Sequence, residues 1–442
     1  MSEIPASWLV AAASMLLLGW VFVQMMRQGR YMALLVWPAF IYLIGPSATT
    51  IFSDAAVLGR YVYESRLVAE TLMMLWYVLL MDLADRMFGL SRALRASLSG
   101  PLLKRLSSSV GFPVIYTTAC ALAGGLQVYT LVTFGSIFSG SYVLEDAAEG
   151  LIPYWGFLAG LYEIVFLCFV LTLFGKKPGR KAGYFYIFLY ATTTLLRVLG
   201  GTRLILIKEL AFMIILFYLR GSIRPRQVAI IGTAVVLAGS GVGLLRGGVE
   251  DVQGLLGPLY GLVMESALNA LTFNIADQAV QNGTVAIAAD PLQTMLFLAL
   301  SVIPSFLRFG ISEDTLLATS PYQIALRSGS DTAAPVGGMS GFASISYVTS
   351  YPWVLLLVMV LAFSAYLKLA RNGHFKQIFV LVLAINAIHF WRDPADIAFK
   401  LLIQGVVICS FLALLPTHRT RRRRRARTAA APASGTLDGA TA

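Results

Sequence analysis

Apolar stretches of roughly 20 residues alternate with short polar loops along most of this chain. A membrane-spanning helix needs about 20 mostly apolar residues, whereas a strand of a membrane β-barrel needs about 10 with an alternating pattern. The pattern therefore predicts an all-α polytopic membrane protein with about 11 spans and a margin of 10–14. The expected spans are 8–26, 31–49, 66–84, 110–135, 153–175, 183–200, 203–220, 227–245, 352–370, 377–390 and 397–415.

Composition supports this class and excludes a soluble protein, since 58% of residues are hydrophobic and 13% are charged. The first apolar stretch has no basic segment before it and no small-residue cleavage site, so we expect a retained span rather than a signal peptide. The three cysteines lie in apolar stretches without metal-ligand spacing. They predict small core residues, with neither a disulfide nor a metal site.

Lys and Arg are concentrated in every second loop and in the C-terminal tail, which together hold 24 of the 34 basic residues. This distribution follows the positive-inside rule and accounts for the net charge of +12 without nucleic acid. We therefore expect an odd number of spans, an external N-terminus and a cytoplasmic C-terminus.

Four regions follow from this arrangement: N-terminal spans (1–245), a large external loop (246–351), C-terminal spans (352–415) and a basic tail (416–442). Within the loop, 254–275 and 291–308 are apolar enough to form either further spans or helices over the membrane surface. The arginine run of the tail favours an anionic-lipid anchor over an RNA contact. Segment 91–109 predicts a basic amphipathic helix on the inner membrane surface.

A second set of arginines lies on the side opposite the basic loops. One of them follows a tight turn, Leu199–Arg203, where Gly200 and Gly201 favour a sharp bend and Thr202 can cap the next helix. Arg203 would then occupy the first turn of that helix, a position that favours phosphate. The alternative is an arginine that reaches the membrane interface. Arg246 ends the next outward span beside two glycines.

Polar residues in the large loop give further candidates. Glu265 and Asn269 are four residues apart in an apolar helical pattern and so share a face, as a binding surface or a solvated one. Ser305 and Arg308 close another apolar segment after a proline. Glycines that suit a flexible binding loop follow, among them Gly337 and Gly338.

The most specific cluster is His389–Asp396, at the outer end of the tenth span. Pro394 suits the first turn of the next helix, which places Asp396 and Lys400 on one face with Arg392 just ahead. Cations for a pyrophosphate and carboxylates for a hydroxyl are the mixture that glycosyl transfer from a lipid carrier requires. A juxtamembrane salt-bridge patch is the alternative, and we expect His389 to be packed or hydrogen-bonded.

The ionisable residues inside predicted spans include four candidates near the proposed site: Glu163, Arg197, Lys208 and Glu209. Such residues are costly in a membrane and mark either ion pairs between helices or a functional site. Their positions favour neither interpretation over the other.

The motifs together resemble the Wzy-type polymerases of oligosaccharide repeat units, from O-antigen and enterobacterial common antigen synthesis. The resemblance covers about 195–415 and rests on LGGTR (199–203), Arg246, MESALNALTF (264–273), IPSFL (303–307), VGGMSGFASISY (336–347) and WRDPAD (391–396). The first 190 residues match in hydropathy only. At Asp393–Pro394 the family carries a Glu-Gly type sequence, so the role of Asp393 is less secure.

This resemblance implies a glycosyltransferase of the bacterial inner membrane with a GT-C type fold, an active site facing the periplasm and neither metal nor cofactor. It implies transfer of a growing glycan from undecaprenyl pyrophosphate to another lipid-linked repeat unit, with a chain-length regulator as a possible partner. Arg203, Arg246, Arg392 and Arg308 would bind pyrophosphate. Glu265, Asp396 and Asp393 would position or activate the acceptor hydroxyl.

Two other functions use similar features. An O-antigen ligase shares the donor, but we expect a histidine in its large external loop, and 246–351 contains none. A lipid-sugar flippase or other transporter would place charges along a central path with repeat symmetry, whereas these charges cluster on one face. The sequence therefore favours the polymerase.

Overall fold

The computed structural model describes residues 5–52, 64–99, 101–134, 143–175, 179–200, 203–234, 351–370, 373–393 and 395–417, together with residues 263, 266, 267 and 270. These residues are almost entirely helical, and within them the only β-pairing is an isolated bridge between Ser109 and Thr417. Five of the described helices are long and apolar enough to cross a membrane. The all-α class is confirmed, and this part of the chain provides five of the spans expected.

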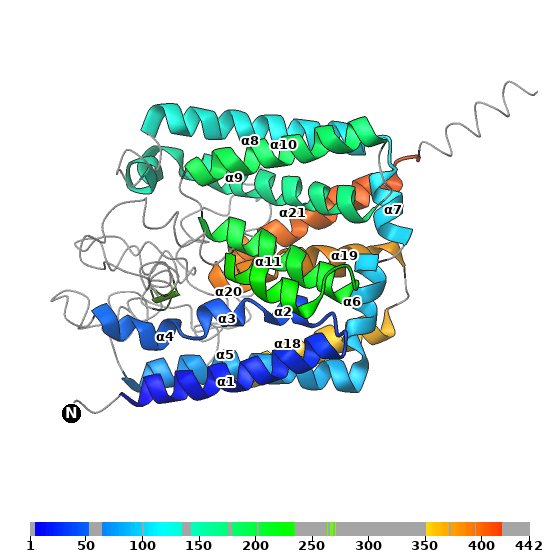
Figure 1. The fold of residues 1–442 in the computed structure, drawn as a ribbon. Helices are drawn as coiled ribbons and strands as arrows, with labels where there is room; N and C mark the ends of the chain where they lie inside the picture. Colours follow the sequence, from blue (N-terminus) through cyan, green and yellow to red (C-terminus); the bar gives the residue numbers. More distant parts are fainter. Residues whose placement is uncertain are drawn as a thin grey trace, which may run out of the picture.

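The helices form a bundle with three layers (Figure 1). One outer layer holds α1 (Ala6–Arg27), α5 (Glu64–Phe88) and α18 (Pro352–Leu369), and the other holds α8 (Phe112–Phe134), α9 (Val143–Phe174) and α10 (Arg180–Leu199). Between them lie α11 (Arg203–Leu219), α19 (His374–Ile385), α20 (Ala387–Arg392) and α21 (Ala395–Leu414). The middle layer therefore has protein on both sides, which is where a buried site can form.

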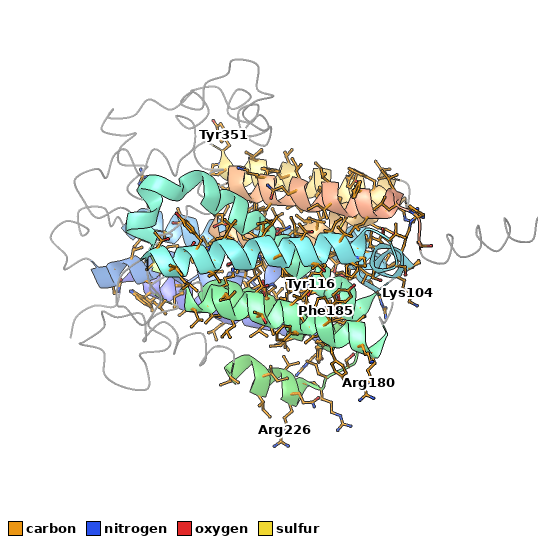
Figure 2. All side chains as sticks on the ribbon, turned by 90° about the horizontal axis from the view of Figure 1, so that it is seen from above. Lys104, Tyr116, Arg180, Phe185, Arg226 and Tyr351 are labelled. Carbon is orange, nitrogen blue, oxygen red and sulfur yellow. The ribbon has the colours of Figure 1, made fainter. Side chains whose placement is uncertain are left out.

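Large apolar side chains cover the outside of the bundle, as Phe185 on α10 illustrates (Figure 2). Leu16 on α1 is 77% exposed and Val132 on α8 is 81% exposed. Side chains of this kind suit hydrocarbon rather than water, because a soluble helix exposes its polar face.

Residues 31–49 do not form the continuous span that the hydropathy predicts. They form three one-turn helices, α2 (Ala33–Val36), α3 (Ala39–Tyr42) and α4 (Gly45–Ala48), followed by a 3-10 turn, η1 (Thr49–Phe52). Pro38 and Pro46 interrupt the helical hydrogen bonding. A Cβ on Gly45 would lie 2.5 Å from the backbone oxygen of Ser266, so glycine is needed for this close approach. Ser266 Oγ also donates to the carbonyl of Tyr42 at 3.3 Å.

Segment 91–109 forms two helices at one end of the bundle, α6 (Leu90–Ser99) and α7 (Pro101–Ser107). Their leucines are completely buried, at Leu94, Leu98, Leu102, Leu103 and Leu106. The apolar face of this amphipathic segment is therefore covered by other helices, chiefly α19 and α9. Arg92, Arg95 and Lys104 point outward.

The basic residues expected on one side of the membrane do gather at this end of the bundle, which α6 and α7 close (Figures 1 and 2). Several cap the C-terminal carbonyls of neighbouring helices. Arg105 donates to the carbonyl of Ala413 at 2.8 Å, Arg220 to that of Leu98 at 2.6 Å, and Lys376 to that of Ala370 at 3.0 Å. Cations at helix C-termini are favourable because the last carbonyls lack partners within the helix.

Candidate functional site

An ion pair between α11, in the middle layer, and α9, in an outer layer, forms the centre of the candidate site. Lys208 of α11 lies 2.5 Å from Glu163 Oε1 of α9, and the side chains are 2% and 6% exposed. An isolated charge would be very unfavourable here, so each side chain requires the other. Both residues are charged and lie in largely apolar helices. This is the feature of the sequence from which they could be predicted.

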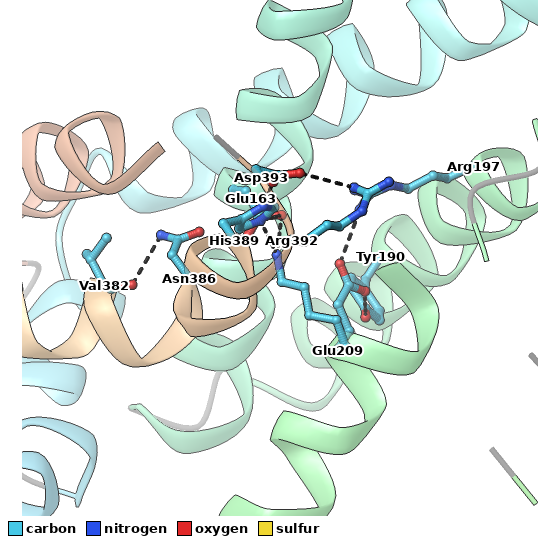
Figure 3. Close-up of polar contacts among 10 residues, drawn as sticks. Glu163, Tyr190, Arg197, Glu209, Val382, Asn386, His389, Arg392 and Asp393 are labelled. Atoms are coloured by element: carbon cyan, nitrogen blue, oxygen red, sulfur yellow. Dashed lines mark hydrogen bonds and ion pairs between the residues drawn. The ribbon is translucent and has the colours of Figure 1, made fainter. Parts of the chain in front are cut away.

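His389 of α20 adds a third helix to this pair (Figure 3). Its Nε2 lies 2.7 Å from Lys208 Nζ and 3.1 Å from Glu163 Oε1. An ammonium can only donate, so Nε2 is the acceptor and the ring proton lies on Nδ1. Nδ1 then donates to Asp393 Oδ2, one helical turn further on. The prediction of a hydrogen-bonded histidine is confirmed.

The chain of contacts ends at Arg392. Its Nη1 lies 3.7 Å from Asp393 Oδ1. The Arg392 side chain is 30% exposed, whereas that of Asp393 is 12% exposed. Asp393 thus holds both His389 and Arg392. Asp393, one of the predicted catalytic carboxylates, therefore binds His389, which was not among the predicted catalytic or pyrophosphate-binding residues.

A second buried pair lies on the other side of α11. Arg197 of α10 contacts Glu209 Oε1 at 3.3 Å, and the hydroxyl of Tyr190 donates to Glu209 Oε2. The Arg197 guanidinium also lies 3.9 Å from the centre of the Tyr162 ring, in cation–π geometry. The four intramembrane candidates, Glu163, Arg197, Lys208 and Glu209, thus form two pairs across α9, α10 and α11.

The turn after α10 has a different explanation from the one expected. Gly200 has φ −76°, which any residue can adopt, so the bend itself does not require glycine. A Cβ at Gly200 would instead lie 2.1 Å from Nε2 of Gln127 on α8. Gln127 in turn accepts a hydrogen bond from the Tyr162 hydroxyl at 2.6 Å. Gly200 therefore permits close packing beside the Arg197–Glu209 pair.

The structure partly places two other predicted residues. Arg203 is the first residue of α11, as expected, about 7.5 Å along the helix axis from Lys208. Asp396 is the second residue of α21, just after Pro394. The remaining predicted site residues lie outside the described part of the chain: Gly201, Thr202, Arg246, Glu265, Asn269, Ser305, Arg308, Gly337 and Gly338.

An apolar cavity of about 190 Å³ lies between α5, α18, α19 and α21. Its walls include Tyr77, Val360, Leu383 and Phe399, and Phe399 is 41% exposed at the rim. Asn386, Ala387 and Phe390 line it from α20 and the residue before it. The short helix α20 therefore has the cavity on one side and the His389–Asp393 contact on the other.

Comparison of this chain with protein-family models, with curated proteins and with solved structures finds no match.

Proposed function

We propose that this chain is a polymerase of lipid-linked oligosaccharide repeat units, of the Wzy type, at the periplasmic face of a bacterial inner membrane. In this reaction the bond between the anomeric carbon of the growing glycan and undecaprenyl pyrophosphate breaks. A bond forms from that carbon to a hydroxyl oxygen of a second lipid-linked repeat unit, and the hydroxyl proton passes to a base. The reaction needs a cationic site, a proton acceptor and an apolar place for the lipid.

The observation that carries the proposal is the position of α20 between an apolar cavity and a chain of ionisable groups. A lipid-linked glycan is amphipathic, so its carrier and its pyrophosphate need adjoining surfaces of opposite character. The cavity walls are apolar apart from Asn386 and Tyr77. Across α20 lie His389, Asp393 and Arg392. This arrangement supports a lipid-linked substrate with a charged head group.

The residues divide into groups by their chemistry. Arg392 and Arg203, with Arg246 and Arg308 from the loop, would bind the pyrophosphate and stabilise its charge as it leaves. Asp396 and Glu265 would orient or deprotonate the acceptor hydroxyl. Asp393, His389, Lys208 and Glu163 form a connected set that holds the end of α20 in place, and with it Arg392. A chain-length regulator is the partner protein that this function implies.

A deletion strain tests the proposal through its lipopolysaccharide. Loss of a polymerase should leave molecules that carry at most a single repeat unit. Loss of a ligase would instead leave bare core, with long chains accumulating on the lipid carrier. A normal ladder of chain lengths in the deletion strain would overturn the proposal.

Point variants test the cavity. Val360 lines it, whereas Val358 on the same helix is 53% exposed on the outer surface. Val360→Trp should fill the cavity and shorten the ladder, and Val358→Trp should leave the ladder unchanged. Protein levels are measured beside the ladder, because tryptophan at a buried position also disturbs packing.

A lipid-sugar transporter is the second candidate, and the interruption of the helix at Asn386 favours it. Discontinuous helices with ionisable neighbours are common at transporter binding sites. The deletion strain separates the two functions. Without a transporter no repeat unit reaches the outer face, so the strain would carry bare core and no single-unit molecules.

A further inference from the structure

Three buried oxygen atoms without hydrogen-bond partners line one small cavity beside the Lys208–Glu163 pair. They are Glu163 Oε2, Asn386 Oδ1 and Gln404 Oε1, and no described residue donates to any of them. The three residues come from α9, from the junction of α19 and α20, and from α21. A buried acceptor without a donor costs about 1–3 kcal/mol, so three around one space call for an occupant.

The orientations of two of these oxygens follow from the contacts that the other polar atom of the same side chain makes. Glu163 Oε1 binds Lys208 at 2.5 Å, which leaves Oε2 for the cavity. The amide nitrogen of Asn386 donates to the carbonyl of Val382 at 3.1 Å, so its carbonyl oxygen faces away from that helix. Asn386 is 7% exposed and Glu163 is 6% exposed. These two oxygens are therefore fixed in place before anything binds.

Glycine at position 160 leaves room for the third oxygen, Gln404 Oε1, beside α9. A Cβ on Gly160 would lie 2.4 Å from Gln404 Oε1, a distance that real side chains do not tolerate. Gly160 is also one turn before Glu163 on α9, so Gln404 Oε1 approaches the same side of that helix. Without a side chain at 160, α9 and α21 can bring the amide and the carboxylate to one space.

The size and chemistry of the cavity select the occupant. Its volume of about 10 Å³ accommodates a single small ion or water molecule. A water molecule has two protons and can satisfy only two of the three oxygens. A small cation can bind all three, and carboxylate and amide oxygens are ligands of hard cations. The break in the helix at Asn386 is also the type of feature that contributes to Na⁺ sites.

We propose that this cavity is a binding site for one monovalent cation, Na⁺, with Glu163 Oε2, Asn386 Oδ1 and Gln404 Oε1 as ligands. A divalent ion would need more negative charge than Glu163 provides, because this single carboxylate already binds the ammonium of Lys208. The cation and Lys208 bind opposite oxygens of Glu163, so we expect weak affinity that requires millimolar Na⁺. The case for this cation site rests on the three buried oxygens and not on the proposed polymerase function.

Thermal unfolding of the purified protein in lipid nanodiscs, followed by tryptophan fluorescence, tests the site. NaCl is exchanged for LiCl, KCl or choline chloride at constant ionic strength, because choline is too large to enter. Na⁺ should raise Tm above the value in choline by a saturable amount, on the order of 1–2 °C. Asn386→Leu and Gln404→Leu should abolish this difference, whereas Asn386→Asp, which adds a charged ligand, should keep or enlarge it.

Gln127→Leu is the matched control, since Gln127 is a buried amide outside the cavity. This variant should keep the sodium response whatever its absolute Tm. If Asn386→Leu does not fold, Gln404→Leu and Asn386→Asp decide the question. Equal Tm in sodium and choline, or a sodium response that persists in Gln404→Leu, would mean that no cation binds here.

Discussion

The ammonium of Lys208 in α11 lies 2.5 Å from the carboxylate of Glu163 in α9, where both side chains are almost completely buried. We expect Lys208→Met to destabilise the protein by about 3–5 kcal/mol, because it leaves a buried carboxylate without its partner. Replacement of both residues, as Lys208→Met with Glu163→Leu, should recover part of the loss. The measurement is Tm in nanodiscs together with the yield of folded protein.

The control for this pair is Arg86→Gln, which removes an ion pair with Asp82 at the surface. The Arg86 side chain is 50% exposed, so the change should cost no more than about 1 kcal/mol. A Lys208→Met protein as stable as the unmodified one would show that the pair contributes nothing to folding.

Gly200 and Gln127 should depend on each other. Gly200→Ala places a methyl group 2.1 Å from Gln127 Nε2, so we expect a loss of about 1–3 kcal/mol. Gln127→Ala removes the obstacle, and the double variant should be more stable than the sum of the single effects. A double-mutant cycle on Tm measures this coupling. Strict additivity would contradict the steric explanation.

Arg203, Arg246 and Arg392 should be required for chain elongation if they bind pyrophosphate. Loss of one charge-assisted contact is expected to cost about 2–4 kcal/mol of transition-state stabilisation, roughly a hundredfold in rate or more. Arg→Ala variants should therefore lose the visible ladder. Arg→Lys variants should be impaired too, because a lysine keeps the charge without the bidentate geometry.

Arg327 is the control for these variants, since it lies in the loop without flanking motif residues. Its alanine variant should be milder. Arg203→Ala and Arg392→Ala proteins that reach normal levels and still build long chains would reduce these arginines to packing or topology residues.

The distribution of basic residues predicts opposite locations for two reporters. A fusion near Gly329 should report the periplasm, and one after His418 should report the cytoplasm. A phosphatase and a fluorescent protein read the two compartments directly. Reporters that agree with each other would exclude an odd number of spans.

Hydropathy and glycine or proline positions were sufficient to predict several helices closely. The expected span 203–220 is α11 at Arg203–Leu219, and 352–370 is α18 at Pro352–Leu369. The interruptions within 31–49 could not be predicted from hydropathy, because apolar content alone takes no account of Pro38 and Pro46. The expected span 377–390 is likewise divided at Asn386 into α19 and α20.

The candidate site was predictable only as a set of ionisable residues in apolar segments. Their partners were not, because Lys208 and His389 are 181 residues apart in the sequence. Nothing in the sequence joins them, since they meet only where the folded chain brings His389 of α20 to Lys208 of α11 and Glu163 of α9. Asn386 and Gln404 were missed for the same reason, as single amides in apolar helices carry no local pattern.

The capping contacts of Arg105, Arg220 and Lys376 have a consequence for biogenesis. These residues belong to the set that the positive-inside rule would place in the cytoplasm, and in the folded protein they also complete the ends of other helices. A helix inserted in the wrong direction would present its last carbonyls to the opposite compartment, where these cations are absent. If the positive-inside rule holds for this chain, correct insertion and correct packing would therefore depend on the same side chains.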